Sequence, residues 1–240
     1  MVDVAIIGTG KVGLSLLDKV ILFPHLDCVM FAGIREDSPG IARAKKIGIK
    51  TSTKSIDAVV KSKAQIVFDC TTAKAHIKHA PLLKDRFTID LTPSRVGKMC
   101  VPSINLKESL KEKNVNLVTC GIQAMGLIAK QTMDKHPEIK YMELVSTIAS
   151  KSAGMGTRNN IDEFTQTTQD ALEELCGVPK AKAIIVINPA DINMRNTLTY
   201  EVNGKRESVT KIVKDKNGLA GNLNIINLAA IEIAEFYANR

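Results

Sequence analysis

Hydrophobic and polar positions along the first half of the chain follow two alternating periods. Short continuous apolar runs are typical of strands buried on both faces of a sheet. Five such runs occur, at residues 4–7, 27–34, 64–70, 87–91 and 115–119. Segments with helical spacing of apolar residues separate them, at residues 14–21, 41–47, 56–60, 71–83 and 106–111. Strands that alternate with helices in this way predict an α/β fold with a doubly wound parallel sheet of the Rossmann type.

The pattern changes after residue 120. Helices are expected at residues 121–135 and 161–175, the second capped by Asn160, and strands at 139–150, 182–188 and 197–202. The alternation in the first of these strands favours an antiparallel sheet with one covered face. Residues 205–219 are polar with little periodicity and are predicted to be a surface connection. A last apolar helix at 223–237 needs a partner to cover it, so we expect it to return to the first half of the chain.

Three glycines at fixed spacing lie between the first strand and the first helix. Gly8 would permit a tight turn, Gly10 would let the backbone approach a pyrophosphate, and Gly13 would let the helix pack close to the strand. The spacing alone is a weak signal, but here it follows a strand and opens a helix. The context favours a dinucleotide site over an ordinary glycine-bearing turn. The predicted domains are therefore a dinucleotide-binding domain at residues 1–120, completed by a helix at 222–240, and a smaller α+β domain at 121–221.

The end of the second predicted strand bears on which dinucleotide binds. An acidic residue at this place accepts hydrogen bonds from the ribose hydroxyls and selects NAD. Here Arg35 occupies it, and its guanidinium can pair with a 2′-phosphate, with Ser38 as a second donor. The alternative is that Arg35 points to solvent while Glu36 or Asp37 restores a preference for NAD. We expect NADP to be accepted at least as well as NAD.

Cys120 is the candidate nucleophile, because it stands where the last strand of the parallel sheet ends and a helix begins. The amides of that helix would lower the pKa of the thiol. A buried, inert thiol is an equally good interpretation from spacing alone. The amides of Gln123, Asn160 and Asn222 are either caps or groups that orient a nicotinamide or a reaction intermediate. No histidine has metal-ligand spacing, and His76 with His79 is predicted to be a solvated pair.

Composition excludes several classes of protein. The five cysteines are scattered without a CxxC pair, which argues against a disulfide framework and a zinc site. The net charge of +8 comes from dispersed lysines without interleaved aromatic residues, so nucleic acid is not the expected partner, although anionic small molecules would be attracted. No apolar run reaches membrane-spanning length and no signal peptide is evident, so we expect a cytoplasmic protein.

Three blocks carry a family resemblance, at residues 118–124, 150–164 and 220–225. They closely resemble those of the acylating acetaldehyde dehydrogenases, which oxidise an aldehyde to its acyl-CoA thioester with NAD and usually bind a 4-hydroxy-2-oxovalerate aldolase. The resemblance implies that Cys120 is the nucleophile, with Gln123 beside it, that coenzyme A is the co-substrate, and that an aldolase is a possible partner. A strand-rich second domain with an exposed sheet face also favours a homodimer.

The same resemblance implies a set of residues that contact NAD or NADP. These are Thr9, Gly10, Lys11, Val12, Ser152, Ala153, Gly154, Met155, Gly156, Thr157, Arg158, Asn159, Asn160 and Asn222, to which the glycine turn adds Gly8 and Gly13 and the strand-end argument adds Arg35 and Ser38.

Three features of the sequence depart from that family. The stretch between Asn196 and Ala220 is shorter than usual, Arg35 and Asn196 stand where the family has acidic residues, and the segment around Gln123 differs. Two alternatives therefore stay open. One is a dinucleotide-binding member with lost or altered activity, and the other is a reductase of a different acyl thioester or a semialdehyde.

Overall fold

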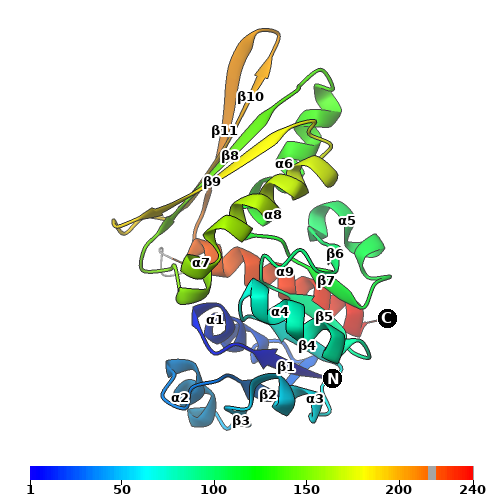
Figure 1. Ribbon diagram of the computed structural model, residues 1–240, viewed down its shortest axis with the longest axis vertical. Helices are drawn as coiled ribbons and strands as arrows, with labels where there is room; N and C mark the ends of the chain where they lie inside the picture. The colour runs from blue at the N-terminus through cyan, green and yellow to red at the C-terminus, as the bar shows by residue number, and fades with distance from the viewer. Residues whose placement is uncertain (216–219, 240) are drawn as a thin grey trace.

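The chain forms two β-sheets with helices packed around and between them (Figure 1). The computed structural model describes residues 1–215 and 220–239. The lower sheet in Figure 1 is parallel and contains the chain's first strands, whereas the upper sheet is mixed and long-stranded. This arrangement confirms the Rossmann-type α/β fold with a second, smaller α+β part.

The parallel sheet has seven strands in the order β3-β2-β1-β4-β5-β7-β6. Their bounds are β1 Val2–Ile7, β2 Leu26–Ala32, β3 Thr51–Ser52, β4 Ile66–Asp69, β5 Phe87–Asp90, β6 Lys98–Met99 and β7 Asn114–Asn116. β4 and β5 are buried along their whole length, as expected for strands covered on both faces. The chain order reverses between β1 and β4, and the carboxyl edge at such a reversal is where ligands bind in this class of fold.

Helices connect these strands. They are α1 Lys11–Val20, α2 Pro39–Lys46, α3 Ser55–Val60, α4 Ala73–His79, the 3-10 turn η1 Ala80–Leu83, and α5 Pro102–Ser109. The predicted helix at 71–83 thus divides into α4 and η1, because Pro81 cannot donate the backbone hydrogen bond that a continuous α-helix needs. α1 buries Leu16, Leu17 and Val20 against the sheet, which confirms the helical spacing seen in the sequence.

The mixed sheet has four strands in the order β11-β10-β8-β9. Their bounds are β8 Met142–Ala149, β9 Ala181–Asn188, β10 Met194–Val202 and β11 Lys205–Val213. The helices α6 Cys120–Lys135 and α8 Ile161–Glu174 cover one face, and α7 Met155–Asn159 precedes α8. β10 is antiparallel to both of its neighbours, but β8 and β9 run parallel, so the expected antiparallel sheet is only partly correct.

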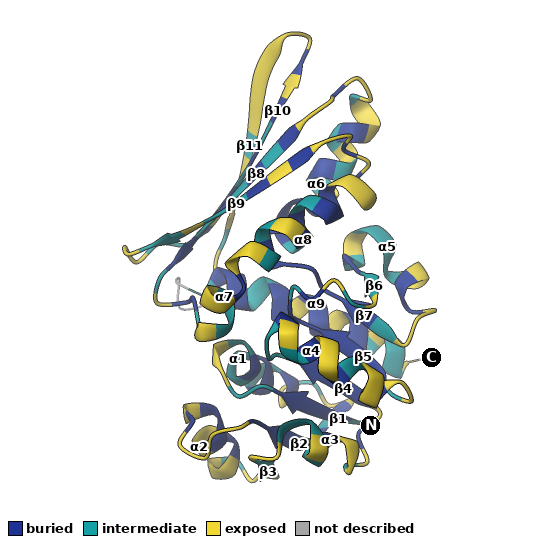
Figure 2. Cartoon of the chain, in the orientation of Figure 1, coloured by how far each residue is buried: buried dark blue, intermediate teal, exposed yellow. Residues whose placement is uncertain are grey.

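The prediction of a surface connection at residues 205–219 is wrong for its first half. Lys205–Val213 forms the edge strand β11, which pairs with β10 along its whole length. Figure 2 shows β11 exposed along most of its length, and seven of its nine residues are exposed. Because most of β11 is exposed and only Val209 and Val213 pack against the core, its sequence carries no strong apolar period. Residues 216–219, the end of that predicted connection, lie outside the described residues.

The last helix, α9 Gly221–Ala238, returns to the parallel sheet as expected. It packs against α1, α5, α6 and β5. Near its end the Tyr237 ring stacks on Phe87 of β5, with ring centroids 4.0 Å apart and planes 9° apart. Because α9 touches both α1 and α6, it ties the two sheets together. No helix in the described parts of the chain is long and apolar enough to span a membrane.

Candidate active site

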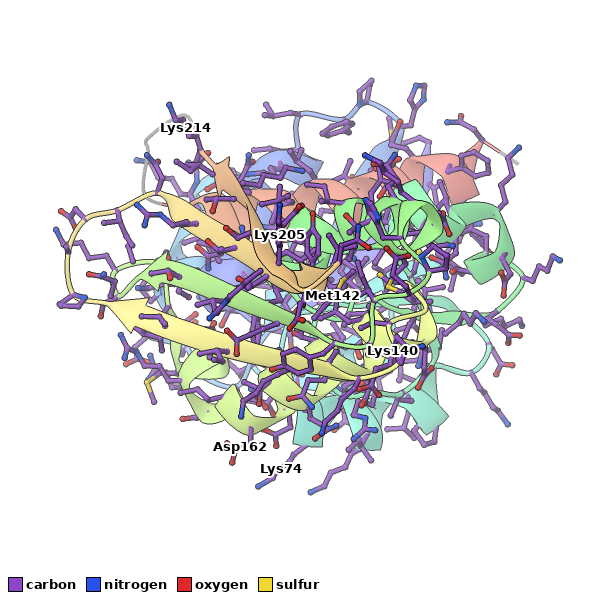
Figure 3. All side chains as sticks on the ribbon, turned by 90° about the horizontal axis from the view of Figure 1, so that it is seen from above. Lys74, Lys140, Met142, Asp162, Lys205 and Lys214 are labelled. Carbon is purple, nitrogen blue, oxygen red and sulfur yellow. The ribbon has the colours of Figure 1, made fainter. Side chains whose placement is uncertain are left out.

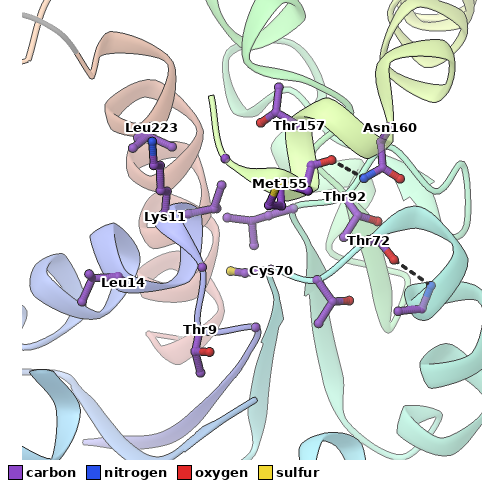
Figure 4. A pocket seen from close by; sticks show the side chains of 18 of the residues that line it. Thr9, Lys11, Leu14, Cys70, Thr72, Thr92, Met155, Thr157, Asn160 and Leu223 are labelled. Atoms are coloured by element: carbon purple, nitrogen blue, oxygen red, sulfur yellow. Dashed lines mark hydrogen bonds between the residues drawn. The ribbon is translucent and has the colours of Figure 1, made fainter. Parts of the chain in front are cut away.

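A cavity of about 670 Å³ lies at the carboxyl edge of the parallel sheet. Its wall is built from the glycine turn after β1, the ends of β2, β4 and β5, the residues before α6, helix α7 and the start of α9 (Figure 4). Lys11 and Arg35 are the cationic groups of this wall, and none of the described residues that line the cavity is a carboxylate. The field of such a wall favours an anionic ligand.

The glycine turn has the geometry that the sequence predicts. Gly8 has a φ of +102°, and a Cβ there would lie 2.5 Å from the carbonyl oxygen of Cys70. A Cβ on Gly13 would lie 1.8 Å from the carbonyl oxygen of Gly8, so Gly13 lets α1 start directly against the turn. A Cβ on Gly10 would meet nothing within 4 Å and would extend into open space. The turn is therefore closed on its inner side and open toward the cavity.

The end of β2 forms the cationic end of the cavity. Arg35 lines it, and the Arg35 Nε lies 3.5 Å from an Asp37 carboxylate oxygen in an exposed ion pair. Glu36 forms an ion pair with Lys45. Ser38 is buried at the start of α2 and donates its hydroxyl to Thr9 Oγ1 at 2.9 Å. The Ser38 hydroxyl is thus already engaged, and the expectation that it serves as a free second donor does not hold in this conformation.

Cys120 is the first residue of α6 and lines the cavity. Thr119 caps the helix by accepting from the Ile122 amide at 3.4 Å, and its hydroxyl is paired with Thr168 at 2.7 Å. Val118, just before the cap, has a φ of +62°, which is a costly conformation for a β-branched residue. The strand β7 ends at Asn116, just before this bend and earlier than predicted.

The expected lowering of the Cys120 pKa by the helix is wrong for this structure. Burial raises the pKa of the thiol to about 12, because only 9% of the residue is exposed. Hydrogen bonds from the amides of Cys120 and Gly121 act in the opposite direction, as the helix argument requires, but they are the smaller effect. A reaction at Cys120 therefore needs a group that takes its proton.

The segment between β8 and α8 lies across the cavity from the glycine turn. Lys11 donates from Nζ to the Lys151 carbonyl and so links the two sides. Asn160 accepts from the Ala73 amide at 3.2 Å and donates to the Gly156 carbonyl. Asn160 occupies the N-cap position of α8 as predicted, but its side chain makes no cap hydrogen bond and joins this segment to the start of α4 instead.

Most residues expected to bind a dinucleotide line one cavity. Those that line it are Gly8, Thr9, Gly10, Lys11, Val12, Arg35, Ser38, Gly154, Met155, Gly156, Thr157, Asn160 and Asn222, and Cys120 joins them. Six expected site residues lie outside this lining: Gly13, Gln123, Ser152, Ala153, Arg158 and Asn159. Of these, Gln123 uses its amide nitrogen to donate to the carbonyls of Cys100 and Leu117, each at 2.8 Å, and Arg158 donates to Ser150.

Two polar atoms in the wall support a polar ligand. Asn222 Oδ1 at the start of α9 and Thr92 Oγ1 after β5 are buried and have no hydrogen-bond partner in the described structure. Buried polar atoms without partners are uncommon and require an explanation. Together with the open Gly10 backbone and the cationic wall, they fit a dinucleotide.

Sequence reasoning missed the polar residues beneath this wall. His76 and His79 were expected to be a solvated pair, but both are buried and both face the Asp69 carboxylate at the end of β4. The signal was present in the sequence, because an acid ends a buried strand and two histidines follow at helical spacing. Charged groups on a buried edge are stable only when they are paired.

Comparisons with known proteins identify the family of this chain. The family model for the dimerisation region of prokaryotic acetaldehyde dehydrogenase matches residues 120–219. The chain is 49% identical to an acetaldehyde dehydrogenase from Carboxydothermus hydrogenoformans over 206 residues, which are 84% of this chain and 69% of that protein. It is 39% identical to one from Spirochaeta aurantia over 280 residues, covering 98% and 94% of the two chains.

Solved structures with low identity share the fold. An aspartate semialdehyde dehydrogenase II from Vibrio cholerae, complexed with ASA, superposes with a TM-score of 0.67 at 12% identity and covers 99% of this chain and 98% of that one. GenD2 from gentamicin A biosynthesis, in complex with NAD, gives a TM-score of 0.65 at 11% identity, with 99% and 85% of the chains covered. From the sequence relatives, this chain belongs to the acetaldehyde dehydrogenase family.

Proposed function

We propose that this chain is a CoA-acylating aldehyde dehydrogenase that converts a short aldehyde to its acyl-CoA thioester. The observation that carries the proposal is that the Cys120 side chain lines the same cavity as the glycine turn. A thiol nucleophile beside a dinucleotide cradle is what aldehyde oxidation through a covalent thioester needs. The names of the relatives favour acetaldehyde as the aldehyde.

The proposed reaction proceeds on Cys120. Its thiolate attacks the aldehyde carbon and forms a covalent adduct. The nicotinamide, when bound, supplies the acceptor for the hydride whose loss turns this adduct into a thioester. The thiol of coenzyme A, after losing its proton, attacks the thioester carbonyl, and the acyl group leaves Cys120 as acyl-CoA. The Cys120 thiolate is regenerated in this last step.

The residues that would hold the dinucleotide come from both sides of the cavity. The glycine turn from Gly8 to Gly13 would take the pyrophosphate on the amides at the start of α1. Residues 154–160 would close over it, and the unpartnered Asn222 Oδ1 and Thr92 Oγ1 would gain hydrogen-bond partners. Because this segment and α9 lie above the sheet, they would also exclude water from the reacting thiol.

The adenosine end of the cavity favours NADP. Arg35 lines it, whereas Glu36 and Asp37 lie outside the lining and are paired with Lys45 and Arg35. A cavity wall without a carboxylate does not repel a 2′-phosphate, and the Arg35 guanidinium can leave its exposed partner to bind one.

The test of the proposed function is CoA-dependent reduction of NAD or NADP with short aldehydes. We expect activity in the parent chain and its loss in Cys120→Ala. Cys176→Ala is the matched control, because Cys176 is a buried thiol outside the cavity. Full turnover by Cys120→Ala would exclude the covalent mechanism.

A second experiment separates the two alternatives. Mixing the chain with acetyl-CoA and measuring the mass of the peptide that contains Cys120 should detect an acetyl adduct. A chain that binds dinucleotide but never forms the adduct would be a binding protein. A chain that is active only with other acyl thioesters or semialdehydes in a substrate panel would be a different reductase. Partnership with an aldolase stays a prediction of the family resemblance.

A further inference from the structure

A cluster of four ionisable side chains lies buried behind the cavity wall. Asp69 ends β4 and Asp90 ends β5, and the two are paired in register. His76 and His79 come from the helix α4 that covers this edge. All four are buried, and Asp69, His76 and Asp90 have no exposed surface. Only His79 of the four lines the cavity, so in the described structure it connects the cluster to the site.

The hydrogen bonds define which nitrogen of each ring is left as an acceptor. Nδ1 of His76 and Nδ1 of His79 lie 3.0 and 2.8 Å from the same Asp69 oxygen, Oδ2. A carboxylate oxygen accepts, so each Nδ1 carries the hydrogen, and Nε2 of each neutral ring is left as an acceptor. Asn114 agrees with this assignment, since its Nδ2 lies 3.2 Å from His76 Nε2. Within the part of the chain that the structure describes, the ring nitrogen left as a free acceptor in this cluster is therefore His79 Nε2.

The charged partner of His79 is the Asp69 carboxylate. Asp69 faces it directly, and hydrogen bonds from the two histidines hold the pKa of Asp69 well below its ordinary value despite burial. His76 binds the same Asp69 oxygen as His79. The other ring nitrogen of His76, Nε2, lies 3.5 Å from an Asp90 carboxylate oxygen. Burial raises the pKa of Asp90 to about 6. An imidazolium at His79 would thus be balanced by the Asp69 carboxylate that already orients the ring.

Other described groups of the cavity wall do not suit the role of base. Lys11 donates to a backbone carbonyl and Arg35 is a permanent cation at the far, adenosine end. Cys70 is a buried thiol whose pKa is raised well above its ordinary value. The wall carries no carboxylate among its described residues. Among the described wall residues, His79 is left as the side chain whose ring nitrogen can accept a proton.

We propose that His79, oriented by Asp69, is the proton acceptor that activates Cys120. The inference rests on the proposed function. The S–H bond of Cys120 breaks, its electron pair stays on sulfur, and the proton reaches His79 Nε2 through the solvent of the cavity. The product is a thiolate and an imidazolium in one cavity, with Asp69 as the counter-ion of the imidazolium. The imidazolium then releases this proton to the solvent, and in each turnover the same nitrogen takes the proton of the coenzyme A thiol and releases it in turn.

The test compares His79→Asn with the parent chain. The asparagine amide can still donate to Asp69, as Nδ1 does, but it cannot take up a proton. His136→Gln is the control, because His136 ends α6 outside the cavity. The first measurement is the rate at which iodoacetamide alkylates Cys120 between about pH 5.5 and 9, with the modified residue located by mass spectrometry. The second is the pH profile of kcat/KM with a short aldehyde.

We expect the parent chain and the control to be alkylated with a midpoint in the histidine range. His79→Asn should lose about 10²-fold in alkylation rate at neutral pH, with its midpoint moved up toward that of the isolated thiol. Its kcat/KM should fall similarly, and added imidazole should restore part of it. A purely structural role for His79 predicts an unchanged midpoint and no rescue.

The outcomes separate this inference from the proposed function. If the aldehyde reaction is absent but alkylation of Cys120 depends on His79, the proposed function fails and the proton acceptor stands. If the chain is active and His79→Asn matches the parent in alkylation rate, midpoint and pH profile, the proton acceptor is overturned and the proposed function stands.

Discussion

At the scale of single residues, the glycine turn and Cys120 show what a sequence pattern determines and what it does not. The spacing of Gly8, Gly10 and Gly13 depends only on local sterics, and the structure has the expected turn. The pKa of the Cys120 thiol depends on how many groups pack over it, which spacing does not reveal. The sequence correctly identified the helix start, but burial outweighs the helix amides there.

Gly13→Ala should destabilise the fold. The added Cβ would lie 1.8 Å from the Gly8 carbonyl, which is backbone and cannot move aside without displacing α1. We expect the free energy of unfolding to fall by about 1–3 kcal/mol or more in urea titrations. Gly10→Ala is the matched control, because its Cβ meets nothing within 4 Å. It should cost at most about 1 kcal/mol in stability but weaken dinucleotide binding. Equal stability of Gly13→Ala and the parent would contradict the packing argument.

Arg35→Asp tests which group recognises the ribose. A carboxylate at this position would accept hydrogen bonds from ribose hydroxyls and repel a 2′-phosphate. The ratio of kcat/KM for NADP to that for NAD should fall by at least about tenfold, the effect of losing one charged hydrogen bond. Lys46→Asp, an exposed change on α2 outside the cavity, is the control for altered net charge. An identical ratio in the parent and Arg35→Asp would mean that Arg35 does not contact the ribose.

At the scale of elements, the apolar period of the sequence predicted the strands and helices that bury apolar side chains. It did not predict the pairing of an exposed strand or the packing of a helix through polar side chains. The strands β4 and β5 are covered on both faces, so their apolar runs were unambiguous. β11 is an exposed edge strand, and its pairing with β10 is invisible in its own sequence. α4 is helical as expected, but it packs on the sheet through two histidines rather than an apolar face.

This packing of α4 predicts a pH-dependent stability. His76 is buried, and its contacts with Asp69 and Asp90 raise its pKa above 6.5 despite desolvation. A group whose pKa is raised by folding stabilises the protein fully below its unfolded pKa, and that contribution is lost as the pH rises through the folded pKa. The free energy of unfolding should therefore decrease from about pH 6.5 upward.

Urea titrations between about pH 6 and 9 would measure this decrease. His76→Gln should be less stable overall but show a flatter dependence in this window. Burial raises the pKa of Asp90 from 3.8 to about 6, so Asp90 titrates at the lower edge of the window, and Asp69 titrates lower still. The contribution of His76 is therefore measured from the slope above about pH 7. The control is His136→Gln at the end of α6. A parent chain whose stability does not change across the window would exclude a raised His76 pKa.

At the scale of the whole molecule, the two sheets have different surroundings. Helices enclose the parallel sheet, whereas α6 and α8 cover one face of the mixed sheet (Figure 1). Figure 3 shows the four strands of the mixed sheet side by side from above. The other face of this sheet carries half-buried and exposed side chains, in cross-strand rows: Ile184, Val145, Thr197 and Thr210, then Val186, Thr147, Arg195 and Ile212. Exposed apolar side chains on an open sheet face, here Val186 and Ile212, indicate an interaction surface.

We expect this face to pair with a second copy of the chain, in line with the dimerisation family model that matches residues 120–219. Val186 is 39% exposed and Ile212 is 53% exposed, and they lie in one cross-strand row, on the two outer strands of the sheet.

The double variant Val186→Lys with Ile212→Lys tests this interface. It would bury two unpaired charges between the copies, and the free energy of their desolvation is far larger than that of the contacts it removes. Light scattering after gel filtration should give twice the chain mass of 26.1 kDa for the parent and the single mass for the variant. Ile77→Lys, a change of equal chemistry on α4 at a residue 52% exposed, should stay dimeric. A parent chain with the mass of one copy at assay concentration would overturn the dimer, and a double variant that remains dimeric would move the interface away from this face.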